Sequence, residues 1–145
     1  MNLKKRALEV LANAHLMSLA TQDEAGVWVA DVIFIYDDDF TIYWMSEPGT
    51  RHSKAIEKNP QVAATITASN KKNEPNFGIQ LEGHAKKIDD ARYDLAVKHR
   101  TKRGHPAPAE TDDILDGDSW YSFTPLRIRL IDEANFGFVA QDVEL

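Results

Sequence analysis

A short stretch in the middle of the chain gathers hydroxyl-bearing and cationic side chains at the expected start of a helix. The stretch reads MSEPGTRHSKAIEKNP, and directly after Gly49 it places Thr50, Arg51, His52, Ser53 and Lys54. The first turn of a helix leaves N–H groups unpaired and carries the positive end of the helix dipole. Hydroxyls can donate hydrogen bonds to an oxyanion there, and arginine and lysine attract it. These are the features expected of a phosphate site.

The same residues also fit a helix start that binds nothing. Thr-x-x-Ser is an ordinary capping pattern, and Arg51 and Lys54 could be solvated cations. The stretch contains neither the Gly-x-x-x-x-Gly-Lys-Ser/Thr loop of nucleotide-binding proteins nor the Gly-x-Gly-x-x-Gly fingerprint of dinucleotide-binding folds. The residues alone therefore leave both interpretations open.

Composition narrows the function classes. The 145 residues carry a formal net charge of −6 and include no cysteine, which excludes disulfides, thiolate metal sites and thiol nucleophiles. The negative charge argues against nucleic acid or a membrane surface as partner. No apolar stretch approaches the ~20 residues of a membrane helix. The five histidines show no ligand spacing, so no metal site is predicted. We expect a cytoplasmic protein with a single domain over residues 1–145.

Periodicity predicts three helices and six or seven strands. The helices are expected at 3–14, 50–58 and 89–104, the last beginning at Asp89 or Asp90 and ending near Gly104. The strands are expected at 15–22, 27–36, 40–46, 61–69, 77–88 and 119–132, the last as two short strands around Pro125. Short turns between consecutive strands favour an antiparallel barrel, an α+β but mainly β fold with helices packed outside.

Two strands carry unusual residues. The segment from Val27 to Tyr36 is almost continuously apolar, so we expect it to be covered on one face by the core and on the other by a helix, a ligand or a second subunit. Asp31 within it is either a paired structural acid or part of a ligand site. Gly78 and Gly83 in the strand 77–88 predict close backbone approach or a bulge. Asp37–Asp39 is expected to be a solvated hairpin turn.

The order of these segments resembles the FMN-binding split-barrel family typified by pyridoxamine 5′-phosphate oxidase. The similarity covers residues 15–138 and lies in LATQ, in Gly-Thr-Arg before a short helix that ends in Asn-Pro, in GIQLEGHA and in WYSFTPLRIRLID. It implies an antiparallel split β-barrel with two or three peripheral helices, and one FMN-binding domain. It also implies a homodimer with FMN at the subunit interface.

The resemblance also implies the residues that would bind FMN. Thr50, Arg51 and Lys54 would hold the phosphate, assisted by Ser53 and His52, while Met45 and Ser46 would lie near the flavin. The backbone of Asp31, Val32, Ile33 and Phe34 would run along the isoalloxazine ring. Gln80 would reach the flavin from the side, and Trp120 would make a contact across the dimer.

The chain departs from the oxidase in three places. The strand matching ADVIFI offers only Asp31 where the oxidase has basic residues, His52 stands where it has lysine, and its Arg-x-His motif has no match. We therefore predict an FMN-dependent oxidoreductase acting on a small molecule other than a B6 vitamer, and no catalytic residue is predicted. The alternatives are a dimer that holds FMN, haem or another phosphorylated ligand without turnover, and a cofactor-free dimer.

Overall fold

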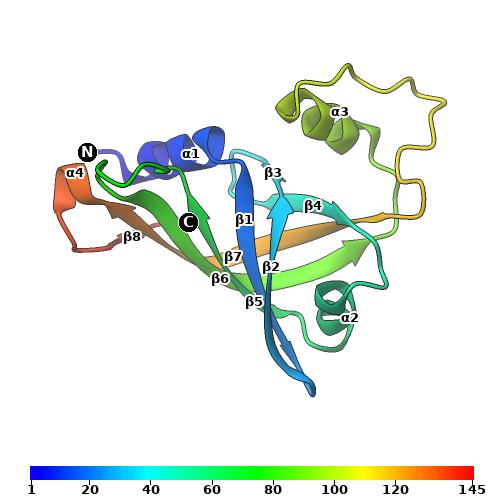
Figure 1. The fold of residues 1–145 in the computed structure, drawn as a ribbon, viewed down its shortest axis with the longest axis horizontal. Coiled ribbons are helices and arrows are strands. Elements are labelled where there is room, and N and C mark those ends of the chain that lie inside the picture. Colours follow the sequence, from blue (N-terminus) through cyan, green and yellow to red (C-terminus); the bar gives the residue numbers. More distant parts are fainter.

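A computed structural model describes all 145 residues, with eight strands and four helices. The strands are β1 (Leu16–Asp23), β2 (Gly26–Ile33), β3 (Ile35–Tyr36), β4 (Ile42–Ser46), β5 (Gln61–Thr67), β6 (Phe77–Ile88), β7 (Ser119–Asp132) and β8 (Gln141–Val143). The helices are α1 (Leu3–Asn13), α2 (Arg51–Lys58), α3 (Tyr93–Lys102) and α4 (Glu133–Phe136). Their arrangement is drawn in Figure 1.

The strands form an antiparallel barrel. Their order is β2-β1-β5-β6-β7-β4-β3, and β8 pairs with β7 outside this path. Only Phe34 separates β2 from β3, so the two ends of the order are one continuous segment and the sheet closes into a six-stranded barrel. The barrel and its peripheral helices confirm the predicted fold class.

The core follows from side-chain alternation along the strands. In β5 exposed and buried residues alternate strictly, because successive side chains of a strand point to opposite faces. The inward residues belong to one cluster of 23 buried hydrophobic residues. Burial of each large side chain contributes about 1.5–3 kcal/mol. The outward residues of β1, β5 and β6 are small or polar, which leaves one face of the barrel open to other molecules.

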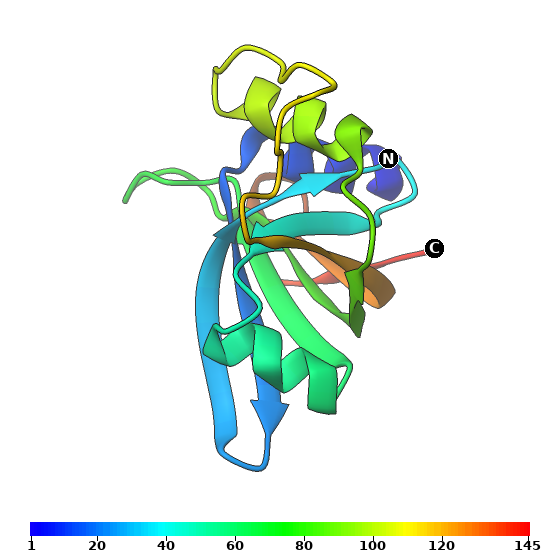
Figure 2. The ribbon, with the colours of Figure 1, turned by 90° about the vertical axis from the view of Figure 1, so that its right-hand side faces the viewer.

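The helices lie at opposite ends of the barrel. In Figures 1 and 2, α1 and α3 lie above the strands, and α2 lies lower, beside the β1–β2 hairpin. Helix α1 buries Ala7, Val10 and Leu11 in the main cluster. Helix α3 contributes Leu95 to a second buried cluster. There Leu95 packs with Trp120 and with other residues on the outer face of β3, β4 and β7. Helix α2 packs against β1, β2 and β6.

The last long strand corrects the prediction of two short strands around Pro125. Strand β7 is continuous through Pro125, which pairs with Gly83 where the register between β6 and β7 shifts after Glu82. The irregularity is possible because Gly83 has no side chain: a Cβ there would collide with the backbone oxygen of Thr124. At Gly78 a Cβ would lie 2.7 Å from the backbone oxygen of Ile66. The predicted close approach at both glycines, and the bulge at Gly83, are confirmed.

The apolar strand 27–36 also differs from expectation. It breaks at Phe34 into β2 and β3. Phe34 and Ile35 are buried, but Val27 and Val29 are 74% and 61% exposed. Within one chain, therefore, nothing covers the outer face of β2. The predicted turn after it is confirmed, because Phe40 donates its N–H to the Asp37 carbonyl in the β3–β4 connection.

Two further boundaries were predicted incorrectly or missed. Helix α3 begins at Tyr93 rather than at Asp89 or Asp90, since Arg92 before it adopts a left-handed conformation. The carboxylate of Asp90 instead accepts a hydrogen bond from the Arg92 amide. Helix α4 and strand β8 were not predicted; both are short, and α4 has only one turn.

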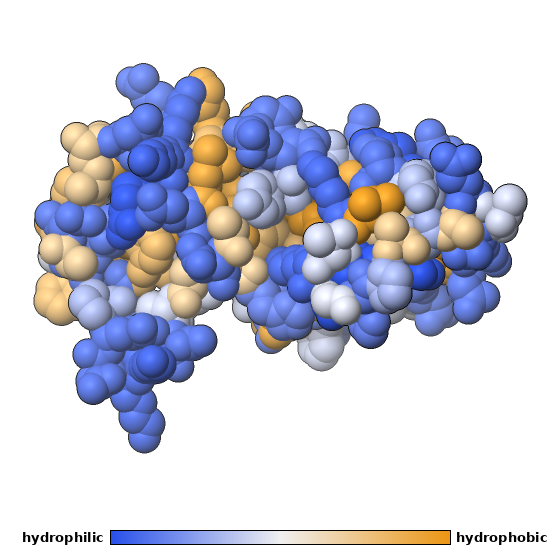
Figure 3. Space-filling model, turned by 90° about the horizontal axis from the view of Figure 1, so that it is seen from above, coloured by the Kyte–Doolittle hydropathy of each residue, from blue (hydrophilic) through white to orange (hydrophobic).

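Seen from above, the surface is mainly hydrophilic, with several smaller hydrophobic areas (Figure 3). None of the four helices combines the length and the apolar character needed to cross a membrane.

Replacing Gly83 by alanine should destabilise the barrel. The added methyl group would meet the backbone of Thr124 and Pro125, which cannot rotate away, so we expect Gly83→Ala to lower the free energy of unfolding by about 2–4 kcal/mol. Gly49→Ala is the matched control, because its Cβ would meet only the flexible Glu47 side chain. Urea unfolding measures both. Equal midpoints for Gly83→Ala and the wild type would show that the bulge tolerates a side chain.

Candidate cofactor site

The start of α2 exposes two unpaired backbone amides. The Thr50 hydroxyl oxygen accepts a hydrogen bond of 3.3 Å from the Ser53 amide, and the Thr50 carbonyl accepts one of 3.0 Å from the Lys54 amide. This confirms Thr50 as the predicted N-cap. The amides of Arg51 and His52 have no partner in the chain. These two donors, at the positive end of the helix dipole, are free to bind an oxyanion.

Hydroxyls and an imidazole gather beside these amides. The Nε2 atom of His52 lies 3.0 Å from the Ser46 hydroxyl and 3.3 Å from the Thr50 hydroxyl. The Thr50 and Ser53 hydroxyls are 2.7 Å apart. Burial lowers the pKa of the half-buried His52, so its ring is neutral at pH 7. The end of β4 and the start of α2 thus form one hydrogen-bonded cluster.

Arg51 is held in place by the β1–β2 hairpin. Its guanidinium carbon lies 4.3 Å from the centroid of the Trp28 ring, and its Nη2 donates to the Ala25 carbonyl at 3.4 Å. A cation over an indole face contributes about 0.5–1 kcal/mol at an exposed site. Figure 2 shows this hairpin running down beside α2. Trp28, which the sequence analysis did not select, therefore orients Arg51, a residue predicted to bind the phosphate.

Two exposed charges flank the cluster. Lys54 is exposed, and its ammonium makes no ion pair. The carboxylate of Glu47 lies beside Gly49, 3.3 Å from where a Gly49 side chain would begin. Glu47 is exposed, so its flexible side chain can move aside when an anion approaches. The sequence analysis did not anticipate this negative charge.

Asp31 and Gln80 lie on the outer face of the sheet rather than in the α2 cluster. Asp31 pairs across the strands with Ser18, Ser18 with Thr65, and Thr65 with Gln80, so these four side chains form a row on one face. The Ser18 hydroxyl donates to the Asp31 carboxylate at 2.6 Å. Asp31 is thus a paired acid on an exposed face, and the role predicted for Gln80 stays a prediction.

The segment expected along the flavin ring carries a cation from α3. Val32 and Phe34 point into the core, and Ile33 is half-buried. Lys102 donates to the Phe34 carbonyl at 2.5 Å, and its ammonium lies 3.4 Å from the centroid of the Phe34 ring. Burial lowers the pKa of Lys102 to about 8, so the side chain is still mostly charged at pH 7. It places a positive charge where the strand itself has no basic residue.

Trp120 is buried under α3 in the single chain. It has no exposed surface, its indole N–H donates to the Ala91 carbonyl at 2.8 Å, and the His99 ring meets it edge-on at 5.7 Å between centroids. A contact of Trp120 across a dimer would need α3 to move, so its burial does not favour the role predicted for it. Met45, directly opposite Trp120 on β4, is half-buried.

Met45 and Trp120 line a cavity of about 310 Å³ between α3 and the loop 105–118. His99, Arg100 and Arg103 form its α3 side, and three loop carboxylates lie opposite, on Asp113, Asp116 and Asp118. Burial, together with the charges of Arg103 and Lys102, lowers the pKa of His99 to about 4. The cavity therefore offers a neutral imidazole and charges of both signs.

The sequence analysis missed Trp28, His99 and Lys102 for two different reasons. The run KHRTKRG fits the general preference for cations at a helix C-terminus, and that preference does not say which side chains turn inward. The spacing of Leu95, His99 and Lys102 on one helix face was the available signal. Trp28 gave no signal, because its contact with Arg51 crosses 23 positions of sequence.

Comparisons with known proteins agree with this fold. The chain is 35% identical over 91 residues to a UPF0306 protein of Photorhabdus laumondii, an alignment that covers 57% of this chain. The chain spans 64% of the length of that relative. The General Stress Protein 26 of Bacillus anthracis superposes with a TM-score of 0.72 at 18% identity, over 99% of this chain and 100% of the other.

A heme binding protein from Mycobacterium smegmatis superposes with a TM-score of 0.75 at 16% identity, covering 99% of this chain and 58% of the other. At such identities the two superpositions show the fold alone. The family model of pyridoxamine 5′-phosphate oxidase matches residues 3–132, which is almost all of the barrel with its first three helices. The chain therefore belongs to the pyridoxamine 5′-phosphate oxidase family.

Proposed function

We propose that the chain binds FMN with its phosphate at the start of α2, forms a homodimer, and acts as an oxidoreductase on a small molecule. The observation that carries this proposal is the set of unused donors at that helix start. The Arg51 and His52 amides have no partner, and the Lys54 ammonium forms no ion pair. Free amides occur at the start of every helix, but the cationic side chains of Arg51 and Lys54 beside them are not needed to cap a helix.

The donors suit a phosphate ester in number and kind. The two amides, the Lys54 ammonium and the Arg51 guanidinium are neutral or cationic donors near one turn of backbone. Each hydrogen bond to a charged partner contributes about 1.5–3 kcal/mol. Four such bonds are enough to offset the desolvation and ordering of a small ligand and to leave micromolar affinity.

The remaining residues would place the rest of the cofactor. The hydrogen bond between Ser46 and His52 holds the end of β4 next to the proposed phosphate site. Lys102 would set a positive charge against the Asp31–Phe34 segment, and a charge close to a bound flavin tunes its electronics. FMN itself, when bound, supplies the hydride and electron transfer. The protein binds it, orients it and limits the access of water.

The cavity beside Met45 is the proposed substrate pocket. Met45 is expected near the flavin, and a substrate must lie next to the ring that oxidises or reduces it. The wall formed by Arg100 and Arg103 faces loop carboxylates including Asp113. A ligand with both an acidic and a basic group would match this pairing. Neutral His99 can accept or donate one hydrogen bond to such a ligand.

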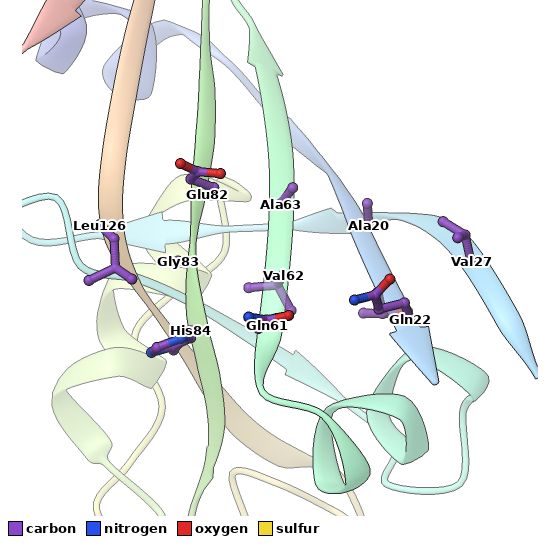
Figure 4. Close-up of a pocket in the computed structure, with 11 residues that line it drawn as sticks. Ala20, Gln22, Val27, Gln61, Val62, Ala63, Glu82, Gly83, His84 and Leu126 are labelled. Atoms are coloured by element: carbon purple, nitrogen blue, oxygen red, sulfur yellow. The ribbon is translucent and has the colours of Figure 1, made fainter. Parts of the chain in front are cut away.

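The second subunit is proposed to cover the outer face of β1, β2, β5, β6 and β7. A groove of about 400 Å³ crosses this face, and Figure 4 shows Ala20, Val27, Ala63 and Leu126 around it. Val27 and Leu126 are 74% and 64% exposed. Exposed large apolar side chains mixed with polar groups such as Gln22 and Glu82 are typical of an interface. A partner would also bury the Asp31–Gln80 row.

Haem binding without turnover is the second candidate, supported by the similarity in fold to the heme binding protein of Mycobacterium smegmatis. Four histidines are accessible, and two of them lie at the surfaces described above: His84 at the outer groove and half-buried His52 in the α2 cluster. Hemin added to the purified protein would then give a sharp Soret band that His84→Ala or His52→Ala removes, while FMN fluorescence would stay unquenched.

Removing the two cations should weaken FMN binding. We expect Arg51→Ala combined with Lys54→Ala to raise the Kd for FMN at least about tenfold, because two charge-assisted contacts to the phosphate are lost. Quenching of FMN fluorescence measures the Kd. The melting temperature of the apo protein should hardly change, since both side chains are exposed.

The control for this pair is Lys4→Ala with Lys5→Ala, which removes the same charge from exposed positions on α1. It should leave the Kd within about twofold, because charges more than a Debye length away are screened. If both double variants bind FMN as tightly as the wild type, the phosphate is held elsewhere. If neither the variants nor the wild type quench FMN fluorescence, the chain does not bind FMN and the proposal fails.

FMN affinity should carry a pH dependence that comes from His52. Burial lowers the His52 pKa in the free protein, and a bound phosphate dianion would raise it by favouring the imidazolium. The extra attraction is present below the pKa of the complex and is lost as the pH rises through it. We expect wild type to exceed His52→Gln in affinity about three- to tenfold near pH 6 and to match it near pH 8.

The ionisation of the FMN phosphate affects both proteins equally, so its effect cancels in the ratio of their affinities at each pH. A ratio of affinities that stays constant from about pH 6 to about pH 8 would show that His52 does not face the phosphate.

The outer face should hold two chains together. We expect light scattering to give about twice the chain mass of 16.3 kDa for the wild type, and about one chain mass for Val29→Glu with Leu126→Glu, because buried carboxylates without partners disrupt an apolar interface. Phe138→Glu is the control: Phe138 is 92% exposed but lies off the groove. A monomeric wild type, or a dimer that survives the double change, contradicts this interface.

A further inference from the structure

Lys102, at the end of α3, is a half-buried cation that no carboxylate neutralises. It takes part in none of the ion pairs of the chain. The polar contacts of its ammonium are both with Phe34: a hydrogen bond of 2.5 Å to the carbonyl, and a distance of 3.4 Å to the centroid of the ring. Taking an unpaired charge out of water costs free energy. The chain therefore keeps a cation where a neutral donor would cost less.

The carbonyl that Lys102 contacts lies at the break between β2 and β3. Phe34 is the single residue between the two strands, and no backbone N–H donates to its carbonyl. The residue has no exposed surface, and a buried carbonyl without a partner costs about 1–3 kcal/mol. Lys102 supplies the missing donor. The bend between the two strands is thus stabilised by a side chain that reaches it from a distant element.

The attachment of α3 to the barrel does not depend on Lys102 alone. Leu95, which is 1% exposed, anchors the helix in the second buried cluster. One turn before Lys102, the ammonium of Lys98 donates to the Tyr36 carbonyl at 3.2 Å and forms an ion pair of 2.7 Å with Asp37. Helix α3 is therefore a supported element, and a side chain on such an element can fix another group precisely.

We propose that Lys102 is a positioning residue for the flavin ring, which fixes from the α3 side the backbone along which the ring would run and keeps a positive charge near it. This inference rests on the proposed FMN binding, in which the segment Asp31–Phe34 runs along the ring. Because Phe34 is fully buried, Lys102 acts through this backbone and not by touching the ring.

The missing carboxylate partner gives the charge of Lys102 a use. Reduction adds negative charge to a flavin, and a cation nearby stabilises that charge. A lysine paired with an acid would supply little net field, because the two charges largely cancel at a distance. An unpaired ammonium held by a carbonyl and an aromatic ring keeps its field, so it can favour the reduced form of a bound flavin.

The first test compares FMN with inorganic phosphate, because phosphate alone probes only the α2 cluster. We expect Lys102→Met to raise the Kd for FMN at least about fivefold by fluorescence quenching. The Kd for phosphate, from NMR titration of the ¹⁵N-labelled protein, should stay within about twofold. Arg51→Ala with Lys54→Ala should weaken both ligands. An unchanged FMN affinity in Lys102→Met overturns the proposal, and so does an equal loss of FMN and phosphate affinity.

Lys98→Met is the matched control, because it removes the same charge from the same helix without a contact to Phe34. It should leave the Kd for FMN within about twofold, whereas a loss as large as that of Lys102→Met would show that only the docking of α3 matters and would overturn the proposal. Lys102→Gln, which keeps a polar group at the half-buried position, replaces Lys102→Met if that variant does not fold.

The midpoint potential of bound FMN tests the charge separately from the folding of the segment. We expect Lys102→Met to weaken the binding of reduced FMN about threefold more than that of oxidised FMN, which lowers the potential of a two-electron couple by about 14 mV. Lys102→Arg, which keeps the charge, should retain the wild-type potential. A wild type that binds no FMN refutes the proposed function and this inference together. Bound FMN whose affinity and potential ignore every change at Lys102 refutes this inference alone.

Discussion

The long ladder between β6 and β7 is the constraint on which the rest of the structure depends. It pairs Phe77 with Asp132 at one end and Ile88 with Trp120 at the other, and it joins β5, β1 and β2 on one side to β4 and β3 on the other. Gly83 lets the β6 and β7 backbones approach where a side chain could not fit, and Gly78 does the same between β6 and β5. Because β4 is registered against β7, its end at Ser46 is carried to the start of α2.

This arrangement concentrates positive potential at a few places in a negatively charged chain. Arg51 rests on Trp28, while Lys102 is partly buried against Phe34. The two come from helices at opposite ends of the barrel, yet both reach residues of the β2 region. A net charge of −6 repels anions at long range, so any anionic cofactor must be recognised by short-range donors rather than by the overall field.

The sequence predicted the elements whose signal is local. Thr50 as a cap, the Asp37–Asp39 turn and the close approach at Gly83 follow from the conformational preferences of single residues, and each is present. Strand alternation and short turns were enough for the barrel. The start of α3 was misplaced because Arg92 adopts a left-handed conformation, which is uncommon for residues other than glycine and is therefore not expected from local preferences.

The candidate site was predictable in part for the same reason. The α2 cluster lies within nine residues of sequence, from Ser46 to Lys54, and the structure brings its hydroxyls and imidazole within hydrogen-bonding distance. Trp28 and Lys102 reach the site from distant segments, and their contacts depend on how α3 and the β1–β2 hairpin pack. The burial of Trp120 under α3 is likewise a consequence of packing between distant elements.

A direct comparison of FMN with riboflavin tests the central claim, because the two ligands share the ring and differ only in the phosphate. Calorimetric titration of the purified protein with each gives both affinities under one condition. If the start of α2 holds the phosphate, FMN should bind at least about a hundredfold more tightly than riboflavin, the equivalent of two charge-assisted hydrogen bonds. Equal affinities, or binding of neither, would contradict the account.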